Sequence, residues 1–226
     1  MSSVTELKLL IDDLVDTSAS TFSEARKVRG LNTAQTKIVN LIMEKDTLYE
    51  WDDYNYSDLN EGYLDIVSGQ DDYDFREDEN NAKVLFISDV WIKRSALDTD
   101  YYRMDKIGTF SNTDTGVPQA YRASGKRIIF NKIFDYSLSD GIKLNFIREP
   151  IEITVSDTTK KPGIPDTFHH LMALYVAYDY ASTKTLANTE RLYRDIITEE
   201  KRLGIYVKKQ MDDHTDFMSP EPIDSV

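Results

Sequence analysis

Hydrophobic positions recur every three to four residues in two segments near the start of the chain, and this spacing predicts two helices. The first helix spans Val4–Val15, with a serine just before it as the N-cap. A polar break at 18–23 separates it from the second helix. That helix is predicted to begin at Asn32 or Thr33, either of which can cap it, and to end near Trp51.

After residue 52 the pattern changes from that of a helix to that of extended chain. The segment richest in strand-forming residues is 83–94, which contains Val, Ile, Phe and Trp. Ser124-Gly125 has the composition of a hairpin turn. The predicted strands are 61–68, 73–75, 83–94, 101–107, 119–123, 126–130 and 142–147, with 151–155 extending the last of them.

Helical spacing returns after the proline- and glycine-containing segment 162–165. Asp166 or Thr167 can cap a helix whose apolar residues share one face, and a last helix covers 188–212. Gly204 lies inside that last helix, where it costs about 1 kcal/mol relative to Ala. The residues that follow show no periodicity and include two prolines, which predicts an extended tail.

The order of elements is two helices, several strands and two more helices, which indicates an α+β protein. We expect a helical bundle formed by the N- and C-terminal helices, with an antiparallel β lobe inserted between them. The predicted domain boundaries are 1–51 for the N-terminal helices, 52–160 for the β-rich lobe, 161–212 for the C-terminal helices and 213–226 for the extended tail.

The chain of 226 residues contains no cysteine. This composition excludes disulfide frameworks, thiol nucleophiles, Fe–S clusters and cysteine-ligated zinc. The first ten residues lack the basic start and the apolar run of a signal peptide, and no apolar stretch approaches the ~20 residues of a membrane span. We therefore expect a soluble protein of a reducing compartment, with no membrane partner.

The net charge of −13 is unevenly distributed along the chain. Residues 46–81 hold thirteen acidic side chains against one base, Arg76, and residues 212–226 hold five acids with no lysine or arginine. Binding of a phosphate backbone needs a clustered basic face, and the sequence shows no such cluster. Tight binding of nucleic acid is therefore not expected.

Close pairs of acidic residues could act as acid/base pairs of a glycosidase or as ligands of Mg²⁺ or Ca²⁺. Adjacent residues of a strand point to opposite faces, however, so pairs such as Asp71-Asp72 are interpreted as solvated loop residues. The adjacent His169 and His170 project about 100° apart on a helix, which disfavours joint binding of one metal. The sequence also lacks a nucleophile elbow and a phosphate-binding glycine motif. It predicts no enzyme, no cofactor and no metal site.

Two groups of residues are typical of assembly surfaces. An aromatic group within the acidic stretch either caps the core where the helices meet the lobe or forms a subunit interface: Tyr49, Trp51, Tyr54, Tyr56 and Tyr63. Apolar residues of the tail either dock onto a partner or remain free: Phe217, Met218 and Ile223. The basic residues of the last helix either form a solvated face, where they interact favourably with the negative end of the helix dipole, or take part in docking.

Several short phrases follow one another in a characteristic order between about residues 25 and 185. They are Arg29-Gly30-Leu31-Asn32, Trp51-Asp52-Asp53-Tyr54, 68–75 (SGQDDYDF), 116–121 (GVPQAY) and 164–171 (IPDTFHHL). With these phrases the chain resembles tail adaptor proteins of tailed bacteriophages, also called head-to-tail connector or neck proteins. One departure is Asn131-Lys132, which stands where similar proteins have a proline-containing turn.

The resemblance implies a structural virion protein without catalytic activity, made in the host cytoplasm and located in the virion neck at the head–tail junction. It implies a homo-oligomeric ring, usually a dodecamer, that binds the portal protein and tail or nozzle proteins. DNA would pass through the channel of this ring during genome ejection without specific binding. Another neck component, a stopper or a tail terminator, is the alternative, followed by a glycan-active enzyme or binding module.

Site residues follow from this resemblance together with the tail and the charge pattern. Docking onto the portal and tail is assigned to Lys208, Lys209, Phe217, Met218, Pro220, Pro222 and Ile223. The subunit or lumen interface is assigned to Trp51, Asp53, Tyr54, Tyr56, Asp71 and Asp72. Because an acidic lining repels phosphate, part of the stretch 46–81 is expected to face the lumen or the tail side.

Overall fold

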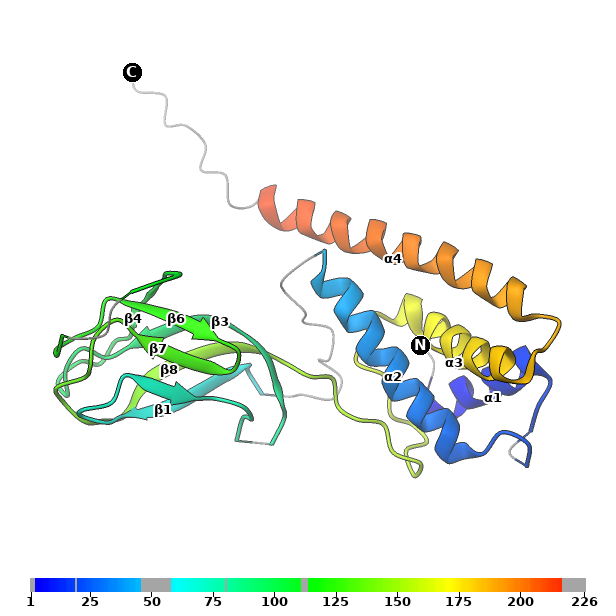
Figure 1. The fold of residues 1–226 in the computed structure, drawn as a ribbon, viewed down its shortest axis with the longest axis horizontal. Coiled ribbons are helices and arrows are strands. Elements are labelled where there is room, and N and C mark those ends of the chain that lie inside the picture. Colours follow the sequence, from blue (N-terminus) through cyan, green and yellow to red (C-terminus); the bar gives the residue numbers. More distant parts are fainter. Residues whose placement is uncertain (1–2, 19, 46–57, 80, 111–113, 217–226) are drawn as a thin grey trace, which may run out of the picture. The chain divides into compact units, whose positions relative to one another are not determined.

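The computed structural model describes residues 3–18, 20–45, 58–79, 81–110 and 114–216, with the side chains of the last helix described as far as Lys209. The chain forms two compact units (Figure 1). Unit 1 combines Met1–Ser57 with Pro150–Val226, and unit 2 is Asp58–Glu149. The described elements of unit 1 are helices and those of unit 2 are strands, so the protein belongs to the mixed α+β class.

The first helix, α1, spans Val4–Val15, as the spacing of its apolar residues predicted. Ser3 is its N-cap and forms a capping box with Glu6. In this box the Glu6 backbone N–H donates to Ser3 Oγ, and the Ser3 backbone N–H donates to the Glu6 carboxylate at 2.7 Å. Leu7 and Ile11 are fully buried, so one stripe of the helix faces the core.

The second helix, α2, spans Glu24–Met43 and therefore begins well before the predicted start at Asn32. The prediction was wrong because Lys27 occupies a core position near the beginning of this helix. Its side chain is fully buried, and its ammonium group lies 2.5 Å from a carboxylate oxygen of Asp12 and 3.0 Å from one of Glu24. A charged residue at a buried position interrupts the apolar period from which a helix is predicted.

Residues 151–155 do not extend the preceding strand, contrary to expectation. Pro150 has no N–H with which to continue a ladder, and the segment bonds to α2 instead. Asn32 Nδ2 donates to the carbonyl of Ile153 at 2.8 Å, and Asn32 Oδ1 accepts from the Ile153 N–H at 2.9 Å. The predicted helix cap therefore serves, from the middle of α2, to hold a neighbouring segment.

Helix α3, His169–Lys184, follows a short 3-10 turn at Asp166–Phe168. It contacts α1, α2 and the last helix, α4. Because neighbours surround it, α3 is buried on more faces than the single one predicted. Four consecutive side chains are buried: Leu171, Met172, Ala173 and Leu174.

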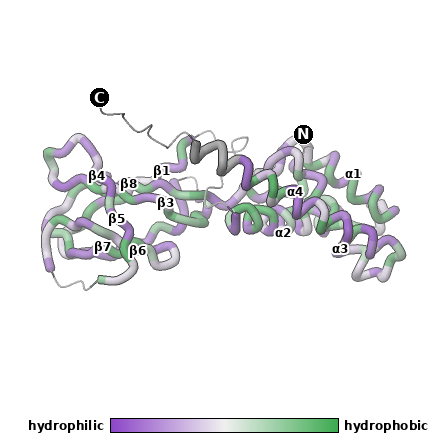
Figure 2. The backbone as a smooth tube through the Cα atoms, turned by 90° about the horizontal axis from the view of Figure 1, so that it is seen from above, coloured by the Kyte–Doolittle hydropathy of each residue, from purple (hydrophilic) through white to green (hydrophobic). Residues whose placement is uncertain are grey.

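Helix α4 spans Thr189–Asp216 and continues past its predicted end at residue 212. The buried stripe predicted for it is confirmed: Leu192, Ile196, Leu203 and Val207. Hydrophobic and hydrophilic residues both occur along this helix, as expected for one that packs on one side only (Figure 2). Among the described residues, no helix combines the length and the apolar character that crossing a bilayer requires.

Unit 2 contains two four-stranded sheets, with the strand orders β1-β8-β3-β4 and β2-β7-β6-β5. Neighbouring strands are antiparallel except β5 and β6, which are parallel, so the second sheet is mixed and not antiparallel throughout as expected. The strands are β1 Glu61–Ile66, β2 Asp72–Asp74, β3 Val84–Ile92, β4 Tyr102–Arg103, β5 Asp105–Lys106, β6 Ala120–Ser124, β7 Arg127–Phe130 and β8 Leu138–Arg148.

The single strand predicted at 101–107 is divided between the two sheets. Its first part, β4, pairs with β3, and its second part, β5, pairs with β6. Met104 lies between them, is buried, and donates its N–H to the carbonyl of Val90 at 2.8 Å. The chain therefore passes from one sheet to the other at Met104. One hydrophobic core, with side chains such as Val90 and Phe130, joins the two sheets.

The hairpin between β6 and β7 has the two-residue turn Gly125-Lys126, one residue later than predicted. Gly125 has a φ of 63°, a left-handed conformation that is accessible to glycine at little cost. A glycine at the first position of a two-residue turn matches the twist of the strands that it joins. This turn places Lys126 and Arg127 at one end of unit 2.

Candidate interaction surfaces

Most of the residues predicted to form interfaces lie outside the described part of the chain: Trp51, Asp53, Tyr54, Tyr56, Phe217, Met218, Pro220, Pro222 and Ile223. The structure describes the other four and does not bring them into one unit. Lys208 and Lys209 are exposed on α4 in unit 1. In unit 2, Asp71 directly precedes β2 and Asp72 is its first residue.

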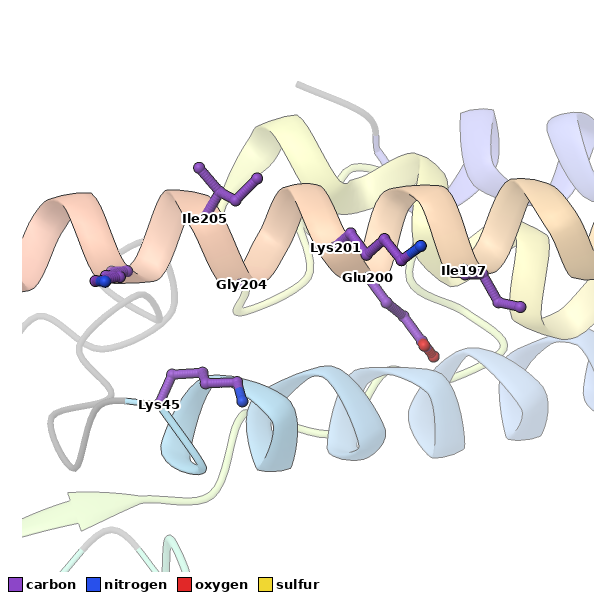
Figure 3. A pocket seen from close by; sticks show the side chains of 7 residues that line it. Lys45, Ile197, Glu200, Lys201, Gly204 and Ile205 are labelled. Atoms are coloured by element: carbon purple, nitrogen blue, oxygen red, sulfur yellow. The ribbon is translucent and has the colours of Figure 1, made fainter.

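Lys208 lines a groove of about 870 Å³ on unit 1, called here the α4 groove (Figure 3). Lys45, just beyond the end of α2, lines it as well, whereas Lys209 is not among its described lining residues. All of its described lining residues except Lys45 belong to α4, where the spacings of three and four among them place them on one face of the helix. They are Ile197, Glu200, Lys201, Gly204, Ile205 and Lys208.

The α4 groove combines apolar side chains with three cations. Ile197 is half-buried, and Ile205 is 59% exposed. Lys45, Lys201 and Lys208 supply the positive charge. These α4 residues lie outside the buried stripe of the helix and form a second, partly exposed face. Lys208 was predicted from the sequence and Ile205 was not, although the spacing of residues 197, 201, 205 and 208 indicates that they share a face.

Glu200, the one acid among the described lining residues of the α4 groove, is held by side chains from two other helices. The Tyr175 hydroxyl donates to Glu200 Oε1 at 2.5 Å, and Lys37 Nζ lies 3.2 Å from the same oxygen. Lys37 also lies over the Tyr175 ring, 3.8 Å from its centre. Burial, followed by the bond to Glu200, raises the pKa of Tyr175 far above its ordinary value. Glu200 thus ties α4 to α2 and α3.

Gly204 leaves open space in the middle of the α4 groove. No described atom lies within 4 Å of the position that a Cβ would take at this residue. The glycine is therefore not required for close packing within the described chain. The missing side chain widens the groove beside Ile205.

Asp71 and Asp72, the two predicted interface residues of unit 2, make different contacts. The Asp71 carbonyl accepts a hydrogen bond from the Phe130 N–H at 2.8 Å. The Asp72 carboxylate pairs across the sheet with the guanidinium of Arg127, which also lies 3.4 Å from Asp74 Oδ1. Asp72 is therefore neutralised locally, which weakens any part that it could have in repelling DNA.

A second groove, of about 480 Å³, lies on unit 2 beside the β6–β7 turn and is called here the cationic groove. Its described lining residues are Arg76, Glu77, Lys83, Ser124, Lys126 and Arg127. This groove was not predicted from the sequence, because its bases come from separate segments of the chain. Only Arg76 belongs to the acidic stretch, and folding brings three bases from outside the stretch next to it.

The described residues offer little for metal chemistry. They contain no group of three or more His, Cys, Asp or Glu side chains arranged to hold a metal ion. His169 is buried, with Nε2 3.2 Å from the carbonyl oxygen of Ile164, whereas His170 is exposed. The two histidines face different surroundings, as their position on a helix predicted.

The described residues form a helical unit and a β unit, and each unit carries an open groove. The sequence model of the SU10 adaptor protein family matches residues 4–220, and the chain belongs to this family of phage head–tail adaptors. The resemblance found in the short phrases is thereby confirmed. No match was found among curated proteins. The protein is a structural adaptor of a bacteriophage and a virion component of the head–tail junction.

Proposed function

We propose that the protein forms a homo-oligomeric, dodecameric ring between the portal protein and the tail or nozzle proteins, and that the genome passes through the channel of this ring during ejection. Membership of the adaptor family supports a structural role at this junction. The excess of negative charge, −13 per copy, supports a channel that lets DNA pass without holding it.

The observation that carries the proposal is the exposed second stripe of α4. Ile205 and Lys208 lie on this stripe, and the helix continues to Asp216, directly before the apolar C-terminal residues. An apolar helix face rimmed by cations, continued by an apolar segment, is suited to docking on another protein. The docking surface for the portal and tail consists of Lys208, Lys209, Phe217, Met218, Pro220, Pro222 and Ile223.

The contact between copies, or the wall of the channel, is proposed to include Trp51, Asp53, Tyr54, Tyr56, Asp71 and Asp72. Within this set Asp72 is paired with Arg127, so it contributes less repulsion than an unpaired carboxylate. The repulsion of DNA then depends on the other acids of the stretch 46–81. In this proposal α4 and its C-terminal extension bind the portal, and the acidic stretch forms the contact between copies or the wall of the channel.

Native mass spectrometry of the protein, alone and mixed with the portal ring of its phage, tests the proposal. Wild type is expected to add a full ring of copies to the portal. Ile205→Glu places a charge in the α4 groove, and deletion of residues 217–226 removes the apolar segment, so each is expected to abolish this addition. Thr198→Glu is the control, because Thr198 is exposed on α4 but is not among the described lining residues of the groove.

The result that overturns the proposal is a wild-type protein that ignores the portal. Stoichiometric binding to a tail component instead would establish a stopper or tail terminator. If Ile205→Glu and Thr198→Glu bind the portal equally well, the α4 groove is not the docking surface. Circular dichroism of each variant checks that the helices are retained.

A further inference from the structure

The cationic groove of unit 2 favours an anionic partner. Four of its six described lining residues are basic. Arg76 and Arg127 approach Asp74, each at 3.4 Å, but Lys83 and Lys126 form no ion pair with any described carboxylate. An incoming carboxylate would relieve the mutual repulsion of these cations.

The opposite end of unit 2 carries the loop 93–101 and the segment 135–140, whose last three residues begin β8; the two are called here the acidic loops, because together they hold four acids against two bases. Their acidic side chains are Asp98, Asp100, Asp135 and Asp140. Asp65, at the end of β1, joins them: its Oδ1 accepts from the Ser139 hydroxyl at 3.0 Å and from the Asp140 N–H at 2.9 Å. The two bases of these loops lie over tyrosine rings, Lys93 over Tyr101 at 4.8 Å and Arg94 over Tyr102 at 4.1 Å.

Strand β8 separates the cationic groove from the acidic loops. Its first residue, Leu138, lies within the second acidic loop, and its last residue, Arg148, pairs with Val84, next to the groove residue Lys83. At about 3.3 Å per residue, the eleven residues of this strand span roughly 30 Å. The two surfaces of one copy therefore cannot reach each other, whereas those of two copies can.

We propose that copies of this chain bind head to tail through unit 2, with the acidic loops of one copy seated against the cationic groove of the next. The contact is heterologous, because it joins two different surfaces, and such contacts close into a ring when the rotation between copies permits it. The inference rests on the proposed ring and names the surfaces that join its copies. It also explains how chains that each carry a charge of −13 come together.

A phosphate backbone is also anionic, but the cationic groove suits a protein loop better. Binding of DNA needs a basic face extended along the helix. Here the bases are confined to one hollow that includes Glu77, with Asp72 and Asp74 beside it. Asp98 accepts hydrogen bonds within its own loop, but the exposed side chains of Asp100 and Asp135 present separate carboxylates on short connections.

A charge-swap experiment tests the head-to-tail contact. The groove variant carries Lys83→Glu and Lys126→Glu, and the loop variant carries Asp100→Lys and Asp135→Lys. Each variant alone opposes like charges at every contact, so it is expected to lose the assembly that wild type shows alone or on the portal. An equimolar mixture is expected to recover rings with equal numbers of the two variants, because each reversed groove then meets a reversed loop.

A second measurement locates the contact directly. The chain has no cysteine, so Ser124→Cys in the cationic groove and Ala96→Cys in an acidic loop introduce the only thiols. A short thiol-specific cross-linker is expected to join the double variant into closed multimers at low salt and to join it less at 1 M salt, where charges are screened. The two single variants are the controls, and they are expected to assemble without becoming covalently cross-linked.

Several outcomes overturn the inference. One is assembly of the groove variant and the loop variant as efficient as that of wild type, and another is a mixture that does not recover. A groove variant whose only defect is weaker binding of a short DNA duplex would assign the groove to DNA. If wild type builds rings on the portal while charge reversal has no effect, only the head-to-tail contact is wrong. If wild type builds no ring under any condition, the proposed function fails as well.

Discussion

Arg148 Nε lies 2.8 Å from Asp78 Oδ2, and both side chains are almost completely buried, at 3% and 1% exposed. Asp58 brings a second carboxylate to 2.5 Å from Arg148 Nη2, which also donates to the carbonyl of Leu59 at 2.9 Å. Asp58 is the first residue of unit 2, and Arg148 is the last residue of its final strand. One guanidinium therefore joins the two ends of the unit.

This cluster predicts that Asp78→Ala strongly destabilises unit 2. Removing one partner of a buried ion pair typically costs about 3–5 kcal/mol. Arg148 keeps the carboxylate of Asp58, whose side chain is 39% exposed, so the cost is expected near the lower end of this range. The backbone N–H of Ala82 also loses its acceptor, Asp78 Oδ1, at 2.7 Å. Urea unfolding measures the change. Glu79→Ala, an exposed acid one residue away, is the control and should change the free energy of unfolding by less than about 0.5 kcal/mol. Equal stability of the two variants would contradict the prediction.

A second prediction concerns the pH dependence that Glu24 contributes to unit 1. Burial alone would raise the pKa of Glu24, but the ammonium groups of Lys27 at 3.0 Å and Lys8 at 3.3 Å hold this pKa below its ordinary value of 4.5. A carboxyl with a lowered pKa in the folded state stabilises the fold above its unfolded pKa, and this stabilisation is lost as the pH falls through the folded pKa.

The midpoint of thermal unfolding is therefore expected to fall as the pH is lowered below about 4.5. Glu24→Gln should lower the midpoint at neutral pH and should reduce its dependence on acid, because the substituted side chain does not titrate. Glu190→Gln, at an exposed position at the start of α4, is the matched control. A Glu24→Gln protein with the same acid dependence as wild type would rule out this contribution.

Two helical glycines are expected to respond differently to alanine. Gly204→Ala should stabilise α4 by about 1 kcal/mol, because alanine favours helix and no described atom lies within 4 Å of the added Cβ. Gly30→Ala, inside α2, should not stabilise, because the added Cβ would lie 3.0 Å from both Val176 methyl carbons. Chemical unfolding of the two variants measures the difference. Stabilisation of the same size at both positions would contradict the prediction, because it would show that Val176 moves away from the added methyl group at little energetic cost.

Elements with a regular local pattern could be predicted from the sequence. The apolar period of Val4–Val15 predicted α1 to the residue, and the segment 83–94 contains β3. The start of α2 could not be predicted in this way. Lys27 occupies a buried position there, and its burial depends on Asp12, which belongs to another helix. The division of 101–107 between two sheets likewise depends on Met104 reaching Val90.

Of the two candidate surfaces, one could be predicted in part from the sequence and the other could not. Lys208 could be recognised because charge and amphipathic spacing are properties of one helix. The cationic groove could not, because Lys126 is far in sequence from Arg76 and Lys83, and Arg76 lies in a strongly acidic stretch.

The sequence by itself determined the class of this protein: its α+β order, its acidic charge and its place among phage adaptors all follow from the order and composition of residues. Only the tertiary structure decided which side chains share a surface. Local patterns report which face of an element is apolar, whereas a groove or a buried ion pair needs residues from separate segments to meet. That meeting depends on sheet register and helix packing, which are set by the free energy of the whole fold.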